Sequence, residues 1–104
     1  MAVALATDFN PGTSPTPNLP LILTLGVSQL RLSVAEAVVA ATVNGAAALG
    51  LAGDIGQLAA GCYADLALFD FQDVRELPYW YGDNRCRATW VRGKACYSSN
   101  LAIT

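Results

Sequence analysis

A short polar loop near the N-terminus holds the residue types that could do chemistry. The apolar run at residues 2–7 stops at the carboxylate of Asp8, and three further candidates follow closely: Asn10, Gly12 and Thr13. In barrels of parallel strands, active sites collect where strands end, and a carboxylate there can bind a metal or carry a proton from water to a leaving nitrogen. An amide, a glycine and a hydroxyl beside it could grip a polar ligand that carries an amide or carboxylate group.

The same residues also have a purely structural interpretation. A lone aspartate at a strand end commonly forms an Asx turn that satisfies the loop backbone, and Asn-Pro-Gly is ordinary turn chemistry. Asp65 is typical of a β-turn or of a polar group at the start of a strand. The aromatic cluster Tyr79, Trp80 and Tyr81 favours packing or an interface over stacking on a ligand. Residue types alone leave both interpretations of Asp8 open.

Composition limits the classes of function. The chain has 104 residues, with 54% hydrophobic and 13% charged, whereas about 25% charged is usual. This composition is typical of a piece of a larger protein or of an obligate oligomer, because a free small domain has much surface to cover. A net charge of −2 without a basic cluster argues against a nucleic-acid or anionic-membrane partner. The absence of histidine excludes imidazole catalysis and any self-contained metal site that uses imidazole.

Cysteine usage and hydropathy indicate a cytoplasmic protein without a membrane span. Cys62, Cys86 and Cys96 are odd in number and lack a C-x-x-C spacing, which favours reduced thiols over disulfides or a zinc site. Residues 34–53 are strongly apolar, but they are rich in alanine and interrupted by glycines, so we expect a buried helix. The N-terminus has no basic stretch before its apolar run and is not expected to be a signal peptide.

In the first half of the chain we expect one strand and two helices. Residues 2–7 show no polar alternation, which suits a strand buried on both faces of a parallel sheet. Asn18 is placed to cap a helix over residues 19–30, with Pro20 in its first turn. Ser33 and Glu36 form a capping box that opens a helix reaching Leu49, followed by Gly50 as its C′ residue.

In the second half we expect strands. One covers residues 65–71, and a hairpin covers residues 88–97 with its turn at residues 92–94. The irregular segment between them is aromatic and is interrupted by Pro78. The change in composition near residue 52 separates an αβ half from a β half.

Several motifs in this order resemble the C-terminal end of the amidohydrolase superfamily. They are ALATDFNPGTSP, RLSVAEAVVAATVNGAAALGL, the pattern G-x-L-x-x-G-x-x-A-D-L from Gly56 to Leu66, and RGKACY. The DFNPGT loop resembles the imidazolonepropionase family within that superfamily, and ELPYWYGDNRCRATWVRGK is similar to its late segment. One departure is Cys62, which stands where that family usually has lysine.

The resemblance implies an α/β fold in two parts. Residues 1–52 would be the last strand and helices of a TIM (β/α)8 barrel, and residues 53–104 the C-terminal part of a small β-sandwich domain. A complete barrel needs about 250 residues, so the chain is expected to be a C-terminal fragment of a longer enzyme.

The resemblance also implies an activity. It is the metal-dependent hydrolysis of 4-imidazolone-5-propanoate, a small-molecule substrate, to N-formimidoyl-L-glutamate during histidine degradation. By motif, Asp8 matches the residue that binds the metal and acts as the base. Asn10 and Gly12 match positions that hold the glutamate-like portion, and Thr13 a position that touches the imidazolone. The metal would be zinc or iron, and the intact parent a cytoplasmic homodimer.

The family's metal-binding histidines and its substrate-binding arginine and tyrosine lie on upstream strands. We therefore expect the isolated chain to be inactive, because a catalytic metal usually needs at least three protein ligands. Two alternatives remain. One is a non-catalytic truncated product, and the other is a different amidohydrolase, similar to dihydroorotases or deaminases. The DFNPGT loop favours imidazolonepropionase over the second.

Overall fold

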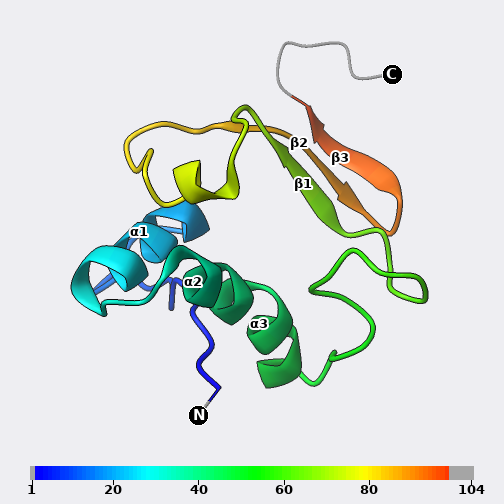
Figure 1. Cartoon of the computed structure of the whole chain (residues 1–104), viewed down its shortest axis with the longest axis horizontal. Helices are drawn as coiled ribbons and strands as arrows, with labels where there is room; N and C mark the ends of the chain where they lie inside the picture. Colours follow the sequence, from blue (N-terminus) through cyan, green and yellow to red (C-terminus); the bar gives the residue numbers. More distant parts are fainter. Residues whose placement is uncertain (1, 99–104) are drawn as a thin grey trace.

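The computed structural model describes residues 2–98, and the helices and the sheet lie on different sides of the molecule (Figure 1). The order is α1 (Leu19–Gln29), α2 (Val34–Ala41), α3 (Val43–Ala48), β1 (Leu66–Phe69), the 3₁₀ turn η1 (Val74–Glu76), β2 (Cys86–Val91) and β3 (Lys94–Ser98). This arrangement agrees with the α/β class expected from the sequence. The segment between η1 and β2 is held to α1 by a hydrogen bond from the Thr24 hydroxyl to the Pro78 carbonyl at 2.6 Å.

The first two helices begin where their capping residues predicted. The Asn18 side chain accepts the Leu21 N–H at 3.3 Å, and Pro20 lies in the first turn of α1. At the start of α2, the Ser33 hydroxyl accepts the Glu36 N–H at 3.1 Å, and Glu36 accepts the Ser33 N–H at 2.9 Å. Both caps satisfy backbone donors that have no partner inside the helix.

The predicted single helix from Ser33 to Leu49 is divided in two, so its continuity was wrong. Thr42 has φ −115° and ψ −84°, and α2 ends before it while α3 begins after it. Its hydroxyl donates to the Val38 carbonyl at 2.7 Å, a contact that bends helices by competing with the backbone ladder. The predicted end is confirmed: Gly50 has φ +76°, and the N–H of Leu51 reaches the Ala46 carbonyl at 2.8 Å, as in a Schellman motif.

The predicted strand and hairpin are confirmed and form one antiparallel sheet of order β1-β2-β3. Arg92 (φ 52°) and Gly93 (φ 78°) occupy the turn between β2 and β3, and two consecutive positive φ angles define a type I′ turn. The Asp65 carboxylate accepts the Arg92 N–H at 2.8 Å. Asp65 therefore has the structural role that its position at the start of a strand predicted.

Residues 2–7 do not form the predicted strand. They run as an extended segment beside the helices, where the Leu5 N–H donates to the Ala40 carbonyl at 3.1 Å and the Asn44 side chain donates to the Val3 carbonyl at 2.8 Å. A parallel strand exists only through its ladder with neighbouring strands. No strand within residues 2–98 lies beside this segment, so its apolar sequence was not sufficient to make it one.

The core is small and built mainly of alanine. The buried apolar side chains are Leu23, Ala37, Ala40, Ala46 and Ala88, and no large side chain is fully buried among the described residues. Several large apolar side chains face outward, including Leu49 at 73% and Leu58 at 80% exposure. All three cysteines are unpaired, as predicted. None of the helices in the described range has the length and apolar character needed to cross a bilayer.

Candidate functional site

The four residues proposed from the sequence lie on one loop, between the extended segment and α1. The loop covers residues 7–14 and contains the predicted turn, which is closed by a backbone bridge from the Asn10 N–H to the Ser14 carbonyl at 2.9 Å. The structure thus brings Asp8, Asn10, Gly12 and Thr13 together through local hydrogen bonds. No contact with the distant sheet is required for this.

The Asn10 side chain is the centre of the loop. Its Oδ1 accepts the N–H groups of Gly12 at 2.9 Å and Thr13 at 2.8 Å. Its Nδ2 donates to the Asp8 carbonyl at 2.7 Å and to the Thr13 hydroxyl at 3.1 Å. A Cβ atom at position 12 would lie 3.3 Å from Asn10 Oδ1, which explains the fit of glycine there. The Asx turn proposed for Asp8 is therefore made by Asn10.

Ser14 is a loop residue that sequence reasoning did not single out. Its half-buried hydroxyl donates to the Thr7 carbonyl at 2.6 Å, where the extended segment enters the loop. The available signal was its place at the end of the Asn-Pro-Gly-Thr-Ser run, since serine hydroxyls commonly bind nearby backbone groups in turns.

Asp8 differs from its neighbours because its carboxylate is uncommitted. The residue is exposed, and within residues 2–98 its side chain has no hydrogen bond or ion pair. Its backbone has φ 48°, in the left-handed region that non-glycine residues rarely adopt. A free carboxylate on a strained backbone is available to a ligand or a metal, whereas one that closes its own turn would not be.

Of the four proposed site residues, Asp8 alone offers a carboxylate that could bind a metal. No cluster of three or more His, Cys, Asp or Glu side chains able to hold a metal occurs in the part of the chain that the structure describes, and the sequence has no histidine. A carboxylate oxygen is a normal ligand for zinc or iron. Asp8 fits a zinc or iron ion as one of its ligands, and the other ligands would have to come from outside residues 2–98.

A groove of about 570 Å³ lies next to the loop. It runs between the extended segment and α3, and Leu5, Thr7, Thr42, Ala46 and Ile55 are among its lining residues. None of the four proposed site residues lines it. Its wall is mostly apolar, so it does not provide the polar groups that the loop provides.

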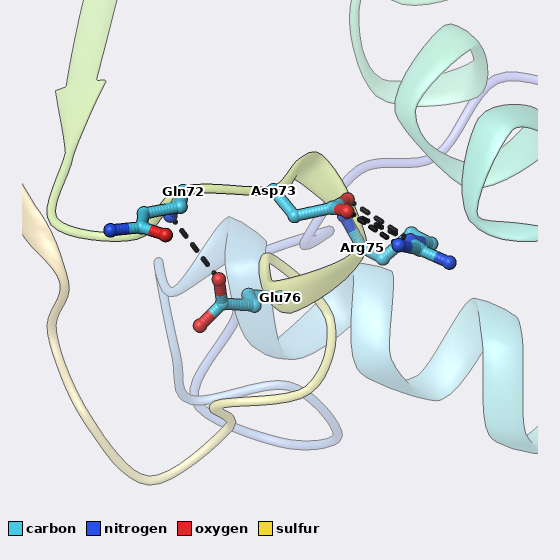
Figure 2. A network of polar contacts seen from close by, with 4 residues as sticks. All are labelled: Gln72, Asp73, Arg75 and Glu76. Atoms are coloured by element: carbon cyan, nitrogen blue, oxygen red, sulfur yellow. Dashed lines mark hydrogen bonds and ion pairs between the residues drawn. The ribbon is translucent and has the colours of Figure 1, made fainter.

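An exposed ion pair with several hydrogen bonds lies elsewhere, at the start of η1 (Figure 2). Arg75 Nη2 donates to Asp73 Oδ2 at 2.6 Å, and Arg75 Nε donates to both carboxylate oxygens at 3.0 and 3.1 Å. These hydrogen bonds lower the pKa of Asp73 to about 2 and raise the pKa of Arg75. Because the Arg75 side chain is 79% exposed and Asp73 also caps η1, this pair has a local structural role.

Comparison with protein families gives one match that covers most of the chain. Residues 2–96 match the model described as "Amidohydrolase family". Curated relatives include imidazolonepropionases from Solibacter usitatus (44% identity over 93% of this chain), Rubrobacter xylanophilus (50% over 88%) and Geobacillus thermodenitrificans (46% over 88%). The matches cover 23%, 22% and 22% of those proteins, so the chain spans about a quarter of their length.

Among solved structures, E. coli guanine deaminase is similar to this chain. The TM-score is 0.72 at 27% sequence identity, over 88% of this chain and 27% of the deaminase. The likeness therefore covers both the helical part and the sheet.

Proposed function

The chain belongs to the amidohydrolase family, and from this premise we propose that it supplies the C-terminal part of an imidazolonepropionase. The enzyme would open the ring of 4-imidazolone-5-propanoate to give N-formimidoyl-L-glutamate in histidine degradation. The observation that carries the proposal is the 44–50% identity to three imidazolonepropionases over about nine tenths of this chain. The uncommitted carboxylate of Asp8 supports it at the level of the site.

In this proposal Asp8 has two roles, as a metal ligand and as the base. A zinc or iron ion held partly by Asp8 would lower the pKa of the attacking water. The Asp8 carboxylate would accept a proton from that water, while the water oxygen forms a bond to the ring carbonyl carbon. When the C–N bond breaks, Asp8 would return the proton to the leaving nitrogen. The exposure of Asp8 at a loop suits this exchange.

The loop would also hold the substrate. We propose that Gly12 leaves room for the glutamate-like portion of the ligand and that the Thr13 hydroxyl touches the imidazolone ring. Asn10 matches a position that holds the same portion in the family. Its amide is already bonded within the loop, so a direct contact with the ligand would require one of these bonds to break.

The architecture follows from the same proposal. Residues 1–52 would complete a (β/α)8 barrel, in which residues 2–7 gain the strand neighbours that residues 2–98 do not provide. Residues 53–104 would complete a small β-sandwich domain. The whole enzyme would be a cytoplasmic homodimer, and the three unpaired cysteines accord with a reducing compartment.

A hybrid enzyme tests the function. Residues 2–104 replace the corresponding C-terminal quarter of the Geobacillus thermodenitrificans relative, and ring opening of imidazolone propanoate is followed by absorbance. We expect the hybrid to be active and the 104-residue chain alone to be inactive, because the chain carries one metal ligand where three are usual.

Asp8→Asn in the hybrid should lower kcat by about 100-fold or more, since it removes the base, and should lower the bound metal measured by mass spectrometry.

Asp54→Asn is the matched control. Asp54 is an exposed aspartate in the loop after α3, and its substitution should leave kcat and metal content unchanged. An inactive hybrid that folds and binds metal would contradict the proposed function. Full turnover in the Asp8→Asn hybrid would remove Asp8 from the mechanism.

A deaminase is the second candidate function. The fold likeness to guanine deaminase supports it, but identity to that protein is 27%, below the 44–50% found for the imidazolonepropionases. Ammonia release from guanine by the hybrid, without ring opening of imidazolone propanoate, would favour the deaminase.

A further inference from the structure

We propose that Ser14 is a positioning residue, which fixes the direction in which the Asp8 carboxylate leaves the loop. This inference rests on the proposed function, because it concerns how the carboxylate of that site is held. It requires no contact between Ser14 and a ligand, and the binding roles proposed for Asn10, Gly12 and Thr13 stay as they are.

The Asp8 backbone has a conformation that needs support from its surroundings. Its φ of 48° is unfavourable for an L-residue because of crowding around Cβ, although aspartate tolerates it better than most residues. Such a conformation persists only where the surrounding structure holds the backbone in place. The direction of the Asp8 Cα–Cβ bond, and with it that of the carboxylate, depends on the two peptide groups that flank the residue.

Ser14 holds the first of these peptide groups. Its hydroxyl donates to the Thr7 carbonyl at 2.6 Å, and this carbonyl belongs to the peptide that leads into Asp8. The contact is half-buried, whereas the side-chain hydrogen bonds that Asn10 makes within the loop are exposed. Water therefore competes less with the Ser14 contact than with the others.

The Ser14 backbone holds the loop on the other side of Asp8. Its carbonyl accepts the Asn10 N–H at 2.9 Å, so Ser14 contacts the chain both before and after the carboxylate. Ser14 also precedes Pro15, and the residue before a proline is largely confined to extended backbone. A hydroxyl on a backbone of little freedom can preorganise a charged group, so that the group meets a metal or a water without rearranging the loop.

Two pairs of variants in the hybrid enzyme isolate the hydroxyl of Ser14. Ser14→Ala removes it; Ser14→Thr keeps it, and Ser14→Val has the shape of threonine without it. We expect Ser14→Ala and Ser14→Val to lower kcat by about tenfold with little change in KM, because a misdirected carboxylate weakens the reacting state more than it weakens substrate binding. Ser14→Thr should restore most of the activity that Ser14→Val loses.

Two further measurements on the same hybrids need no turnover. Ser14→Ala and Ser14→Val should lose the bound metal to a chelator about tenfold faster, because Asp8 is one of its proposed ligands. Hydrogen exchange of the Asn10 amide should also accelerate by about tenfold, since the loop opens more often without the Ser14 contact. If both rates stay unchanged in both variants, the inference is wrong.

Thr24→Val in the hybrid is the matched control. The Thr24 hydroxyl also donates to a backbone carbonyl, that of Pro78, at 2.6 Å and half-buried, but it lies on α1 and not in the loop. Its removal should lower the Tm and leave kcat and the rate of metal loss unchanged. If Ser14→Ala gives the same result as this control, Ser14 has only a structural role and the inference is overturned.

The outcomes separate this inference from the proposed function. If the unsubstituted hybrid folds but does not open the ring, the proposed function fails, while metal loss and Asn10 amide exchange still decide whether Ser14 holds the loop around Asp8. A raised KM with unchanged kcat in Ser14→Ala would show a direct contact with the substrate and would contradict a positioning role.

Discussion

At the scale of single residues, Asp8 and Asp73 show how differently two exposed carboxylates can be held. Asp8 has no polar partner for its side chain among the described residues, whereas Asp73 binds Arg75 through three hydrogen bonds from the guanidinium and one from the backbone N–H. The sequence singled out Asp8 correctly as a residue at a loop entrance. It could not show whether Asp8 or Asn10 closes the turn, because that depends on the backbone angles of the loop and not on residue type.

Asp73 gives a prediction about pH. Its pKa is lowered from 3.8 to about 2, chiefly by the side-chain hydrogen bond from Arg75. The carboxylate therefore contributes stability that is fully present above pH 3.8 and is lost as the pH falls through about 2. A ¹³C NMR titration of the hybrid enzyme should give a midpoint near pH 2 for Asp73, and Arg75→Gln should move it back toward 3.8.

Arg87→Gln is the control for this titration. Arg87 pairs with Asp70 on the sheet at 2.9 Å, away from η1, so its substitution should leave the Asp73 midpoint in place. An Asp73 midpoint near the ordinary aspartate value in the hybrid enzyme without these substitutions would contradict the ion-pair geometry at η1.

At the scale of elements, local signals in the sequence were reliable. Asn18 and Ser33 each predicted the first residue of a helix, and Gly50 predicted a helix end, because a cap needs only neighbours along the chain. The type I′ turn at Gly93 was equally local. Two features were not predictable in this way. The break at Thr42 involves a side-chain hydroxyl that competes with backbone N–H groups for a helix carbonyl. Residues 2–7 form no strand because no neighbouring strand within residues 2–98 pairs with them.

Gly56, in the segment after α3, lies close to Thr42, and this contact gives a prediction about stability. A Cβ atom at Gly56 would lie 2.7 Å from the Thr42 carbonyl oxygen and 2.9 Å from the Ala46 Cβ, and its φ is +91°. Gly56→Ala should destabilise the hybrid enzyme by about 2–4 kcal/mol, from backbone strain plus overpacking. Thermal unfolding measures the effect.

Gly53→Ala is the matched control, because Gly53 has a similar φ of +87° but a Cβ atom there would meet nothing within 4 Å. This substitution should cost only the strain, about 1 kcal/mol. Equal losses in the two variants would show that the approach of Gly56 to Thr42 contributes nothing.

At the scale of the whole molecule, the buried core is too small to hold the large apolar side chains of the sequence. Among residues 2–98, the buried hydrophobic core consists of four alanines and one leucine, while Phe9 and Leu58 are 62% and 80% exposed. Exposed apolar groups of this number usually mark a surface that another part of a protein covers. This agrees with a chain that spans about a quarter of the length of its curated relatives.

The small core predicts that the isolated chain unfolds with low cooperativity. The 104-residue protein should bind the dye ANS strongly, show a broad thermal transition and aggregate with time, because small alanine-rich cores bury little area. In the hybrid enzyme the same residues should unfold sharply. A monomer of the isolated chain that melts in one sharp transition, without dye binding, would contradict this prediction.

The loop at residues 7–14 has a consequence for protein engineering. Its hydrogen bonds join only its own members, so eight consecutive residues hold the backbone around an exposed acidic group without hydrogen bonds to the rest of the chain. We expect such a loop to keep its conformation when it is placed in another scaffold.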